Sequence, residues 1–532
     1  MTAPKGLKPK QPQTPLLTEL TSYADAQTYF NRERLWDLFD GDRDWLNMGH
    51  ECLDRHVDKG RAVRIAHADG RDEEYTFAEL SALSSRFANF VQAQGIRKGE
   101  RVAIMLEPSL AFYVCLFGAM KSGAIAVPLF TLFGPDGLRL RLGDCAASML
   151  VTNTEKAPIA TGYPDLQVVV ADDAFFAELD KHSADFTPQT SAGDMALFQY
   201  TSGTTRELPD AVRHAHRAVV TVAISALYAT GVRPGDNYAC PSSPAWGHGL
   251  AHGTLGPLGL GVNIASYQGR FDPVRMLQVL QDYEITNLSA AATHYRMMKN
   301  SGAADNYRYH LRKATFTGEP IDTATAEFCE ATFGLPIRSI YGTTEVGVVL
   351  VNYPGADDIK VKRGSLGKPV PGVELAILDA EGKPCAPGQV GELMVHRRDD
   401  WFPTKDRAHL DEEGYFYHDG RADDVIISAG YTMGAVEIED VLLKHDDVRE
   451  AAVIGVPDEA RGHVVKAFII TDRPGDDAFV KELQDFTRER LSQHEYPRVV
   501  EFTTELPKTP AGKVNRKKLR DLEASRREGK RT

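Results

Sequence analysis

The chain has little cysteine, and none of it is arranged to suggest a bridge or a metal site. Only six cysteines occur among 532 residues, and they lie far apart, without a Cys-x-x-Cys pair or a cluster with histidine at metal-ligand spacing. The pattern therefore predicts neither a disulfide scaffold nor a structural zinc site, and it favours a reducing, cytoplasmic compartment.

The chain also lacks long apolar runs and has fewer positive than negative residues. No stretch approaches the ~18 consecutive apolar residues that a membrane-spanning helix needs. Residues 1–15 are polar and rich in proline, so we expect a disordered tail and no signal peptide. The net charge of -13 argues against nucleic acid as the main partner. We expect the Lys- and Arg-rich end, 517–531, to be a solvated helix end, with a membrane or nucleic-acid tail as the alternative.

The length of the chain exceeds that of one ordinary domain, so two or more cores are expected. Short apolar segments alternate with helix-length segments in the first part, which predicts a mainly parallel sheet covered on both faces. The expected strands are 102–106, 124–128, 149–152 and 168–171, and the expected helices are 76–95 and 110–121. Glycine and proline become frequent between Gly364 and Gly414, which predicts a small β-rich subdomain.

A turn rich in small hydroxyl residues follows the apolar run 195–198. It reads Thr201-Ser202-Gly203-Thr204-Thr205. Backbone N–H and side-chain O–H groups can converge there on one anion, as a nucleotide phosphate requires. An apolar run over 216–229 follows, so we predict a strand, a phosphate loop and a helix in succession. The Gly-Lys-Ser/Thr ending of the Walker motif is missing, and a plain polar turn is the alternative.

Five further motifs follow this turn in a fixed order. They are Gly318-Glu319-Pro320, Tyr341-Gly342-Thr343-Thr344-Glu345, Thr404-Lys405-Asp406, Gly420-Arg421-Ala422-Asp423-Asp424, and the stretch from Pro507 to Lys513. In this order and at these spacings, the set resembles the adenylate-forming (ANL) superfamily of acyl- and aryl-CoA ligases, peptide-synthetase adenylation domains and luciferases. The resemblance covers nearly the whole chain, and six ordered motifs are far more specific than any one of them.

The resemblance implies an α/β fold in two parts. Residues 1–422 would form a large N-terminal part of two α/β layers plus a distorted β-barrel, and 423–532 a small α+β lid. Within the lid we expect strands at 451–456 and 464–470 and helices near 441–443 and 479–491. Asp423 matches the hinge between the two parts. A rotation there would present either Lys513 or Gly430 to a single site, with Gly430 on the coenzyme A side.

The activity implied by the resemblance is that of an AMP-forming CoA ligase. A carboxylate is a poor electrophile with a poor leaving group, and conversion to an acyl-adenylate makes it reactive toward a thiol. The expected substrates and cofactors are ATP, Mg²⁺, coenzyme A and a small-molecule carboxylic acid. Two alternatives stay open: an adenylating enzyme that loads a separate carrier protein, and a catalytically impaired nucleotide- or acyl-binding homologue.

The resemblance also assigns the nucleotide contacts. Residues Thr201 to Thr205 match the phosphate cradle, and Gly318-Glu319-Pro320 matches the turn beside adenine. Tyr341 matches the stacking aromatic, although a strand-end tyrosine is also an ordinary feature. Asp406 matches the carboxylate that accepts both ribose hydroxyls. Arg421 matches the arginine whose forked donors reach ribose and phosphate.

Three residues carry the expected catalysis. Glu345 matches the Mg²⁺ ligand and Thr344 the α-phosphate contact. Lys513 stands in a loop framed by proline and glycine and matches the lysine that approaches the carboxylate and the α-phosphate, which adenylation needs and thioester formation does not. Acetylation silences this motif in related ligases, so a lysine acetyltransferase and deacetylase acting on Lys513 are expected partners.

The acid pocket is expected around residues 244–249. Trp246 and His248 offer no carboxylate for a substrate amino group, and Gly342 stands where short-chain acetate ligases carry tryptophan, which suggests an open floor. We therefore expect a medium-chain, alicyclic or aromatic acid, with a merely packed His248 as the alternative. Residues 206–211 depart from the family pattern, with Asp210 where lysine is expected, and are not counted as phosphate ligands.

Overall fold

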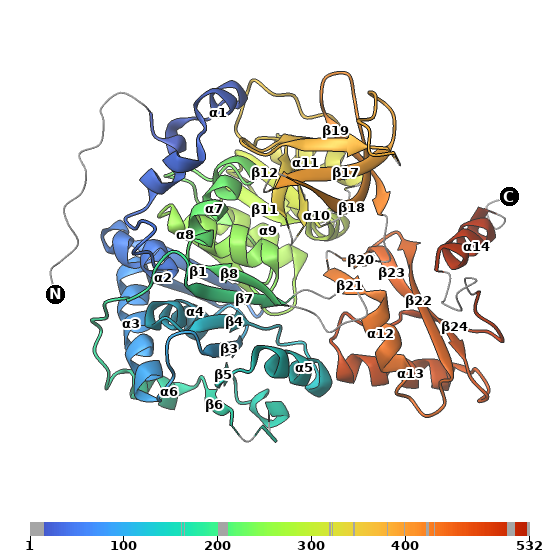
Figure 1. Cartoon of the computed structure of the whole chain (residues 1–532), viewed down its shortest axis with the longest axis horizontal. Helices are drawn as coiled ribbons and strands as arrows, with labels where there is room; N and C mark the ends of the chain where they lie inside the picture. The colour runs from blue at the N-terminus through green and yellow to red at the C-terminus, as the bar shows by residue number, and fades with distance from the viewer. Residues whose placement is uncertain are drawn as a thin grey trace.

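The structure is a computed structural model with a large N-terminal part and a small C-terminal lid (Figure 1). It describes residues 15–160, 162–163, 165–200, 211–318, 321, 323–343, 346–379, 381–397, 400–421, 425–429, 431–507 and 516–528. Two sheets with helices around them make up the large part, and the lid has a sheet of its own. This arrangement confirms the expected α/β class.

The first sheet has six strands in the order β6-β5-β3-β4-β7-β8. Their bounds are β3 (Arg101–Met105), β4 (Ile125–Pro128), β5 (Met149–Thr152), β6 (Gln167–Val170), β7 (Met195–Tyr200) and β8 (Ala211–Ala215). All neighbours are parallel except β7 and β8. The four predicted strands of this region are therefore confirmed, as is their mainly parallel pairing. The helices α5 (Pro135–Cys145) and α6 (Asp173–Leu179) belong to the same region.

The two predicted helices are α3 (Phe77–Ala93) and α4 (Leu110–Ser122). The capping box at the start of α3 is present, since the Thr76 side chain accepts from the Glu79 N–H and Glu79 Oε2 accepts from the Thr76 N–H at 2.8 Å. The two helices lie close together because α4 has a glycine at their contact. A Cβ on Gly118 would lie 2.6 Å from the carbonyl oxygen of Ser84 in α3.

One local expectation is wrong. The chain does not pass from β7 through the hydroxyl-rich turn directly into a helix, because β8 pairs antiparallel with β7 first. Helix α7 (Ala218–Ile224) begins only after β8 and continues as a π-helical turn over Ser225–Ala229. The strand was missed because its sequence, Ala-Val-Arg-His-Ala, carries too little apolar alternation to stand out.

The second sheet has thirteen strands in the order β16-β17-β18-β19-β15-β14-β13-β12-β11-β9-β10-β1-β2. The strands of its first half in sequence are β1 (Arg61–His67), β2 (Asp72–Thr76), β9 (Tyr238–Ala239), β10 (Ile264–Gln268), β11 (Asn287–Ala291), β12 (Lys313–Thr317) and β13 (Arg338–Thr343). From β1 through β10, β9, β11 and β12 to β13 the pairing is parallel. This half corresponds to the second of the two expected α/β layers.

The other half of the second sheet is antiparallel and contains the predicted β-rich subdomain. Its strands are β14 (Gly347–Val351), β15 (Ser365–Pro369), β16 (Leu375–Leu378), β17 (Gly391–Arg397), β18 (Asp400–Leu410) and β19 (Phe416–Arg421). They continue edge to edge from β13, and the pairings among the described strands do not close them into a barrel. In Figure 1 they lie above the parallel strands.

Four apolar clusters pack the described residues of the large part, and two of them contain most of its core residues. The larger one joins strands of both sheets, such as β1 and β3, with α3, α4, α7 and two short helices, α2 (Met48–Cys52) and α8 (Gly256–Gly259). The smaller one packs α9 (Pro273–Asp282), α10 (Ala292–Asn300) and α11 (Thr323–Phe333) onto β11 and β12. The parallel strands are thus buried on both faces, which fixes where their ends lie. Helix α1 (Tyr23–Tyr29) sits at the edge near the antiparallel strands (Figure 1).

The lid has a core of its own. Its elements are β20 (Val425–Ser428), β21 (Tyr431–Gly434), α12 (Ala435–Leu442), β22 (Glu450–Asp458), β23 (Gly462–Ile470), α13 (Asp477–Arg490), β24 (Val499–Phe502) and α14 (Arg516–Glu528). Apolar residues of α12, α13 and the strands β22 and β23 form one cluster, separate from those of the large part. The predicted lid strands and helices are confirmed. The expected hinge, Asp423, lies outside the described residues, so the boundary at 422/423 stays a prediction.

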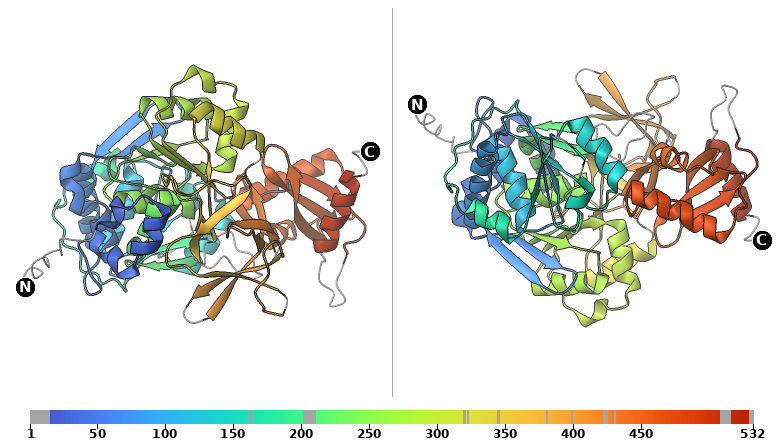
Figure 2. Two further views of the ribbon diagram at one scale, coloured as in Figure 1. Left: turned by 90° about the horizontal axis from the view of Figure 1, so that it is seen from above. Right: turned by 90° about the horizontal axis from the view of Figure 1, so that it is seen from below.

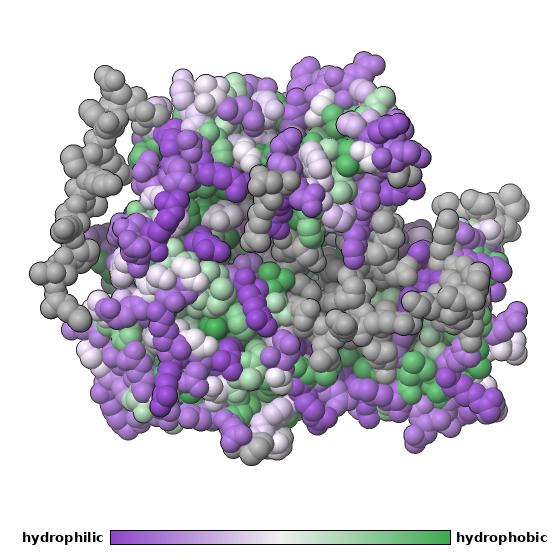
Figure 3. All heavy atoms as spheres, viewed as in Figure 1, coloured by the Kyte–Doolittle hydropathy of each residue, from purple (hydrophilic) through white to green (hydrophobic). Residues whose placement is uncertain are grey.

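The surface agrees with the composition. The face drawn in Figure 3 is mostly hydrophilic, with apolar residues in smaller patches between polar ones. No helix of the described chain is long and apolar enough to cross a membrane. All six cysteines are free, and five of them are buried.

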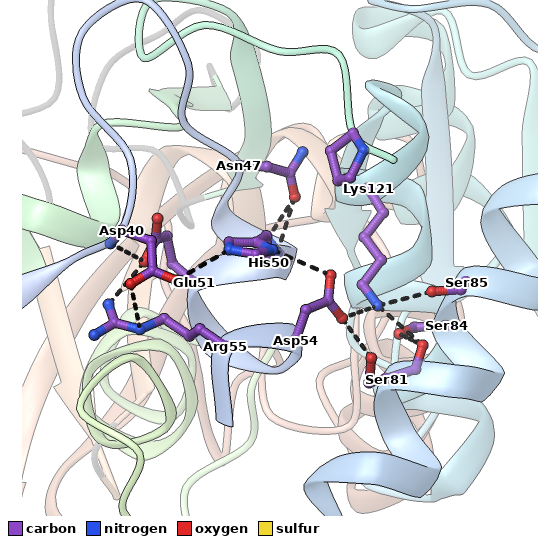
Figure 4. Close-up of polar contacts among 12 residues, drawn as sticks. Asp40, Asn47, His50, Glu51, Asp54, Arg55, Ser81, Ser84, Ser85 and Lys121 are labelled. Carbon is purple, nitrogen blue, oxygen red and sulfur yellow. Dashed lines mark hydrogen bonds and ion pairs between the residues drawn. The ribbon is translucent and has the colours of Figure 1, made fainter. Parts of the chain in front are cut away.

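A buried ion pair joins the N-terminal segment to α3 and α4 (Figure 4). The Lys121 side chain is fully buried and pairs with Asp54, and its Nζ also donates to Ser81 O at 3.0 Å and Ser85 Oγ at 3.1 Å. His50 Nδ1 lies 3.6 Å from the other oxygen of Asp54. Burial would raise the pKa of Asp54, but the hydrogen bond from His50 and the charge of Lys121 lower it overall. Asp54 is therefore held ionised beside the ammonium.

We predict that Asp54→Ala lowers the free energy of unfolding of the large part by ~3–5 kcal/mol, because it leaves a buried ammonium without its carboxylate. Replacing both partners, with Asp54→Leu and Lys121→Met, should cost less than Asp54→Ala alone. Urea-induced unfolding followed by tryptophan fluorescence measures both. Glu33→Ala is the matched control, because Glu33 pairs with Arg43 at 3.0 Å on the surface and should change stability little. A double variant less stable than Asp54→Ala would contradict the prediction.

Candidate active site

The candidate site lies at the carboxyl edge of the parallel strands in the second sheet. Because β9, β11, β12 and β13 are parallel neighbours, the chain leaves each of them at the same edge. The segment with Trp246 and His248 follows β9, Gly318 directly follows β12, and Tyr341 and Gly342 form the end of β13. The fold therefore brings the predicted acid-pocket and adenine residues to one edge. Such edges are the usual ligand sites of open α/β sheets.

Tyr341 and Asp406 meet at this edge. The Tyr341 hydroxyl donates to Asp406 Oδ2 at 2.5 Å, although the two residues are 65 positions apart. Asp406 is only 2% exposed and lies in β18 opposite Arg421 of β19. Three of the predicted nucleotide residues are thus assembled, with Arg421 described by its backbone alone. A buried carboxylate with two acceptor oxygens beside an aromatic ring suits a ribose next to a base.

His418 is a site residue that the sequence did not reveal. Its Nε2 lies 3.3 Å from Asp406 Oδ1, and its ring centroid is 6.2 Å from that of Tyr341. It lies in β19, opposite Ala408 of β18. A lone strand histidine carries no motif, so only the cross-strand register could have pointed to it. Tyr341 and His418 together hold both oxygens of Asp406 in place.

Gly318 has a backbone conformation that favours glycine. Its φ of 93° lies in the left-handed region, directly after β12. The turn that is predicted to lie beside adenine therefore begins with a glycine that the backbone conformation requires. The next two residues of that motif lie outside the described chain.

Trp246 lines a cavity between the large part and the lid. The cavity holds about 730 Å³, counting the part open to solvent. The large part contributes Phe130, Leu132, Phe133, Arg141, Gln199, Tyr200, Trp246 and Gly247, and the lid contributes Tyr431, Met433, Ser492, His494 and Glu495. Its walls are largely aromatic and apolar, which suits an organic acid or a thiol-bearing arm. Tyr200, the last residue before the hydroxyl-rich turn, thus lies beside the predicted acid pocket.

His248 is a fully bonded, buried histidine and does not line this cavity. Its Nδ1 lies 2.9 Å from Ser242 Oγ and its Nε2 lies 2.8 Å from Ser289 Oγ. Burial lowers the pKa of His248 well below its usual value, and the nearby His252 and His294 lower it further. The imidazole is therefore neutral near pH 7 and links the segment after β9 to β11. This geometry favours the packed alternative for His248.

Gly342 is exposed at a bulge between β13 and β14. A Cβ there would lie 2.1 Å from the carbonyl oxygen of Gly347. The close passage of β14 thus accounts for the glycine. The position a side chain would take is filled by β14 backbone, so this arrangement gives the idea of an open pocket floor no support.

The remaining candidate residues lie outside the part of the chain that the structure describes. They are Thr201, Ser202, Gly203, Thr204, Thr205, Glu319, Pro320, Thr344, Glu345, Asp423, Gly430 and Lys513. Among the described residues, no group of three or more His, Cys, Asp or Glu side chains could hold a metal ion. A single glutamate beside phosphates is enough for Mg²⁺, which keeps most of its waters, so the predicted ligand Glu345 requires no such group.

Two family models cover most of the chain. The AMP-binding enzyme model matches residues 53–399, and the AMP-binding enzyme C-terminal domain model matches residues 437–513. These two matches fall on the large part and on the lid. They agree with the order of the motifs and with the division seen in Figure 1.

Individual relatives span nearly the full length. Acetyl-coenzyme A synthetase of Bacillus subtilis (strain 168) is 32% identical over 527 residues, covering 90% of this chain and 91% of its own. The crystal structure of a Brucella canis acyl-CoA synthetase superposes with a TM-score of 0.72 at 31% identity and covers 96% of this chain and 100% of its own. The crystal structure of a benzoate CoA ligase from Burkholderia xenovorans LB400 superposes with a TM-score of 0.63 at 26% identity. It covers 90% of this chain and 100% of its own. The chain therefore belongs to the AMP-binding enzyme family of the adenylate-forming superfamily and is an acid–thiol ligase of the acyl-CoA synthetase type.

Proposed function

We propose that this ligase joins a medium-chain, alicyclic or aromatic carboxylic acid to coenzyme A through an acyl-adenylate. ATP, Mg²⁺ and coenzyme A are the substrates and cofactors of this family. The observation that carries the proposal is the Tyr341–Asp406 hydrogen bond. Two residues assigned separately to adenine and ribose, in motifs 65 positions apart, lie in contact at a ligand-binding edge.

Different residues of the chain would bind the nucleotide, the acid and the thiol. Asp406, fixed by Tyr341 and His418, would accept the ribose hydroxyls, and Arg421 would add donors for ribose and phosphate. Thr201 to Thr205 would cradle the phosphates, with Thr344 on the α-phosphate and Glu345 on Mg²⁺. The adenylate supplies the leaving group that a free carboxylate lacks.

The acid class rests on the aromatic cavity beside Trp246. Its large-part wall includes Phe130, Phe133 and Tyr200, whose rings suit an apolar or aromatic acid. The names of relatives include one four-carbon hydroxy acid and two aromatic acids: 4-hydroxybutyrate–CoA ligase, anthranilate CoA ligase and benzoate CoA ligase. Those names describe the relatives, and the cavity lining is what supports the class for this chain.

Lys513 would bring the cation that adenylation needs, and its acetylation would remove that charge. A lysine acetyltransferase and a deacetylase are therefore proposed partners. We place the enzyme in the cytoplasm because all six cysteines are unbridged, as in a reducing compartment.

We expect the purified protein to release AMP and pyrophosphate when given ATP, Mg²⁺, coenzyme A and a suitable acid. A panel of acetate, octanoate, cyclohexanecarboxylate, benzoate and aminobenzoate tests the class, with thioester detected by mass spectrometry. Octanoate, cyclohexanecarboxylate or benzoate should exceed acetate in kcat/KM. Thioester on a carrier-protein thiol but not on coenzyme A would favour carrier loading, and no AMP with any acid would refute the proposal.

Lys513→Ala should lower the adenylation half-reaction at least ~100-fold, because an ammonium beside developing negative charge is lost. Coenzyme A attack on supplied acyl-adenylate should stay largely intact. Pyrophosphate release measures the first step and thioester formation the second. Lys508→Ala, a lysine five positions earlier, is the matched control and should affect neither. Equal loss of both half-reactions in Lys513→Ala would contradict a role confined to adenylation.

Asp406→Asn should raise the KM for ATP roughly tenfold or more, since a charged acceptor for the ribose hydroxyls becomes a neutral amide. The KM for the acid should change much less. The control is Asp419→Asn in the adjacent strand, whose carboxylate accepts from His409 Nδ1 at 2.7 Å on the surface. Equal effects of the two variants on the KM for ATP would count against the ribose assignment.

A further inference from the structure

The lid docks on the large part through a main-chain contact at the start of α5. The Gly134 N–H donates to the carbonyl oxygen of Leu491 at 2.8 Å. The neighbouring Phe133 and Ser492 form an antiparallel bridge. Both lid residues follow directly after α13, and Figures 1 and 2 show α13 beside α5. The two parts thus meet as two short paired strands would.

Gly134 leaves no room for a side chain in this contact. A Cβ there would lie 1.8 Å from the carbonyl oxygen of Glu489 and 2.6 Å from its carbonyl carbon. Both are backbone atoms, so neither can swing aside as a side chain would. Gly134 itself has φ −77° and ψ 178°, an ordinary extended conformation that any residue adopts. The lid contact, and not the local backbone, therefore requires glycine at this position.

The same contact closes the cavity that Trp246 lines. Tyr431 of the lid stacks on His494 with ring centroids 3.9 Å apart and lies 6.2 Å from the Phe130 ring. Glu495 also lines the cavity and is buried, so that burial raises its pKa while the positive charge of Arg141 in α5 opposes the rise. Lid residues from two separate segments are thus packed against α5 and the cavity only while the lid is docked here.

In this docked orientation, one particular side of the lid lies against the cavity. Strand β21, which begins directly after Gly430, faces the cavity, and both Tyr431 and Met433 line it. Helix α14, which begins three residues after Lys513, lies on the outer side of the lid, away from α5 (Figure 1). The lid therefore presents to the cavity the side that is predicted to face coenzyme A.

We propose that Gly134 is a positioning residue that admits the lid in the thioester-forming orientation. The absence of its side chain lets the backbone after α13 pair with the start of α5. The lid orientation required for adenylation does not use this contact. The assignment of the two half-reactions rests on the proposed function, whereas the docking contact itself does not.

The test replaces Gly134 by alanine. Gly134→Ala should slow thioester formation from supplied acyl-adenylate and coenzyme A at least about tenfold, because the lid cannot seat without moving backbone atoms. ATP–pyrophosphate exchange with the acid should stay within about twofold of the unaltered enzyme. A loss in one half-reaction alone separates a positioning role from general destabilisation.

The matched control is Gly143→Ala on the same helix. A Cβ on Gly143 meets no atom within 4 Å, so both half-reactions should be preserved. Thermal unfolding of both variants checks that they fold. Equal loss of both half-reactions in Gly134→Ala, or thioester formation as fast as in Gly143→Ala, would overturn the proposal.

A cross-link tests the docking without relying on the enzyme's activity. Phe133 and Ser492 face each other in the antiparallel bridge, so their Cα atoms are about 4.5–5.5 Å apart, which suits a disulfide. The double variant Phe133→Cys/Ser492→Cys should form this disulfide with the oxidant diamide, and adding Gly134→Ala should slow its formation at least about tenfold. An unchanged rate would refute the docking role even if no acid substrate were found.

The oxidised double variant also tests the direction of the lid. Because Phe133 also lines the proposed acid cavity, the reference is the reduced form of the same double variant. Relative to that form, the oxidised form should keep single-turnover thioester formation from supplied acyl-adenylate but lose ATP–pyrophosphate exchange. Reduction with dithiothreitol should restore exchange in the same sample. Full exchange in the oxidised form would overturn the assignment of this orientation to thioester formation.

Discussion

The parallel pairing of β9, β11, β12 and β13 is the constraint on which the rest of the site depends. Parallel neighbours point the same way, so segments that are far apart in the sequence leave the sheet at one edge. Trp246, Gly318 and Tyr341 gather there for this reason. The apolar clusters on both faces bury these strands, and a slip in register would expose core residues. The packing of the sheet thereby fixes the relative positions of the site residues.

Two additions to this sheet complete the site, and each uses backbone pairing. The antiparallel strands continue from β13 and include the β18–β19 hairpin, which carries Asp406 to the hydroxyl of Tyr341. The lid is added through the contact between Gly134 and the backbone after α13. The first addition is within one sheet and is permanent. The second is a main-chain contact between two separate cores, which suits the docking and release proposed for the lid.

Much of the local structure was predictable because it depends on residues that are close together in the sequence. The capping box at Thr76 and Glu79, the apolar stretch of α4 and the strands β3 to β6 each show a short-range pattern, and all are present. The lid elements from α12 to α13 were found in the same way. Strand β8 was missed because five mixed residues carry no clear period. His418 was missed because its importance comes from a partner on another strand, at Asp406.

By itself, the sequence determined the family, the order of the motifs and most helices and strands, because these depend on residue types and spacings along the chain. Only the tertiary structure decided what each residue faces. His248 has both ring nitrogens bonded to serine hydroxyls, and Gly342 makes room for β14. Gly134, which belongs to no motif, proved to be the point where the lid seats. The physical reason is that such roles arise from close packing between segments hundreds of residues apart, and no local pattern records a contact of that kind.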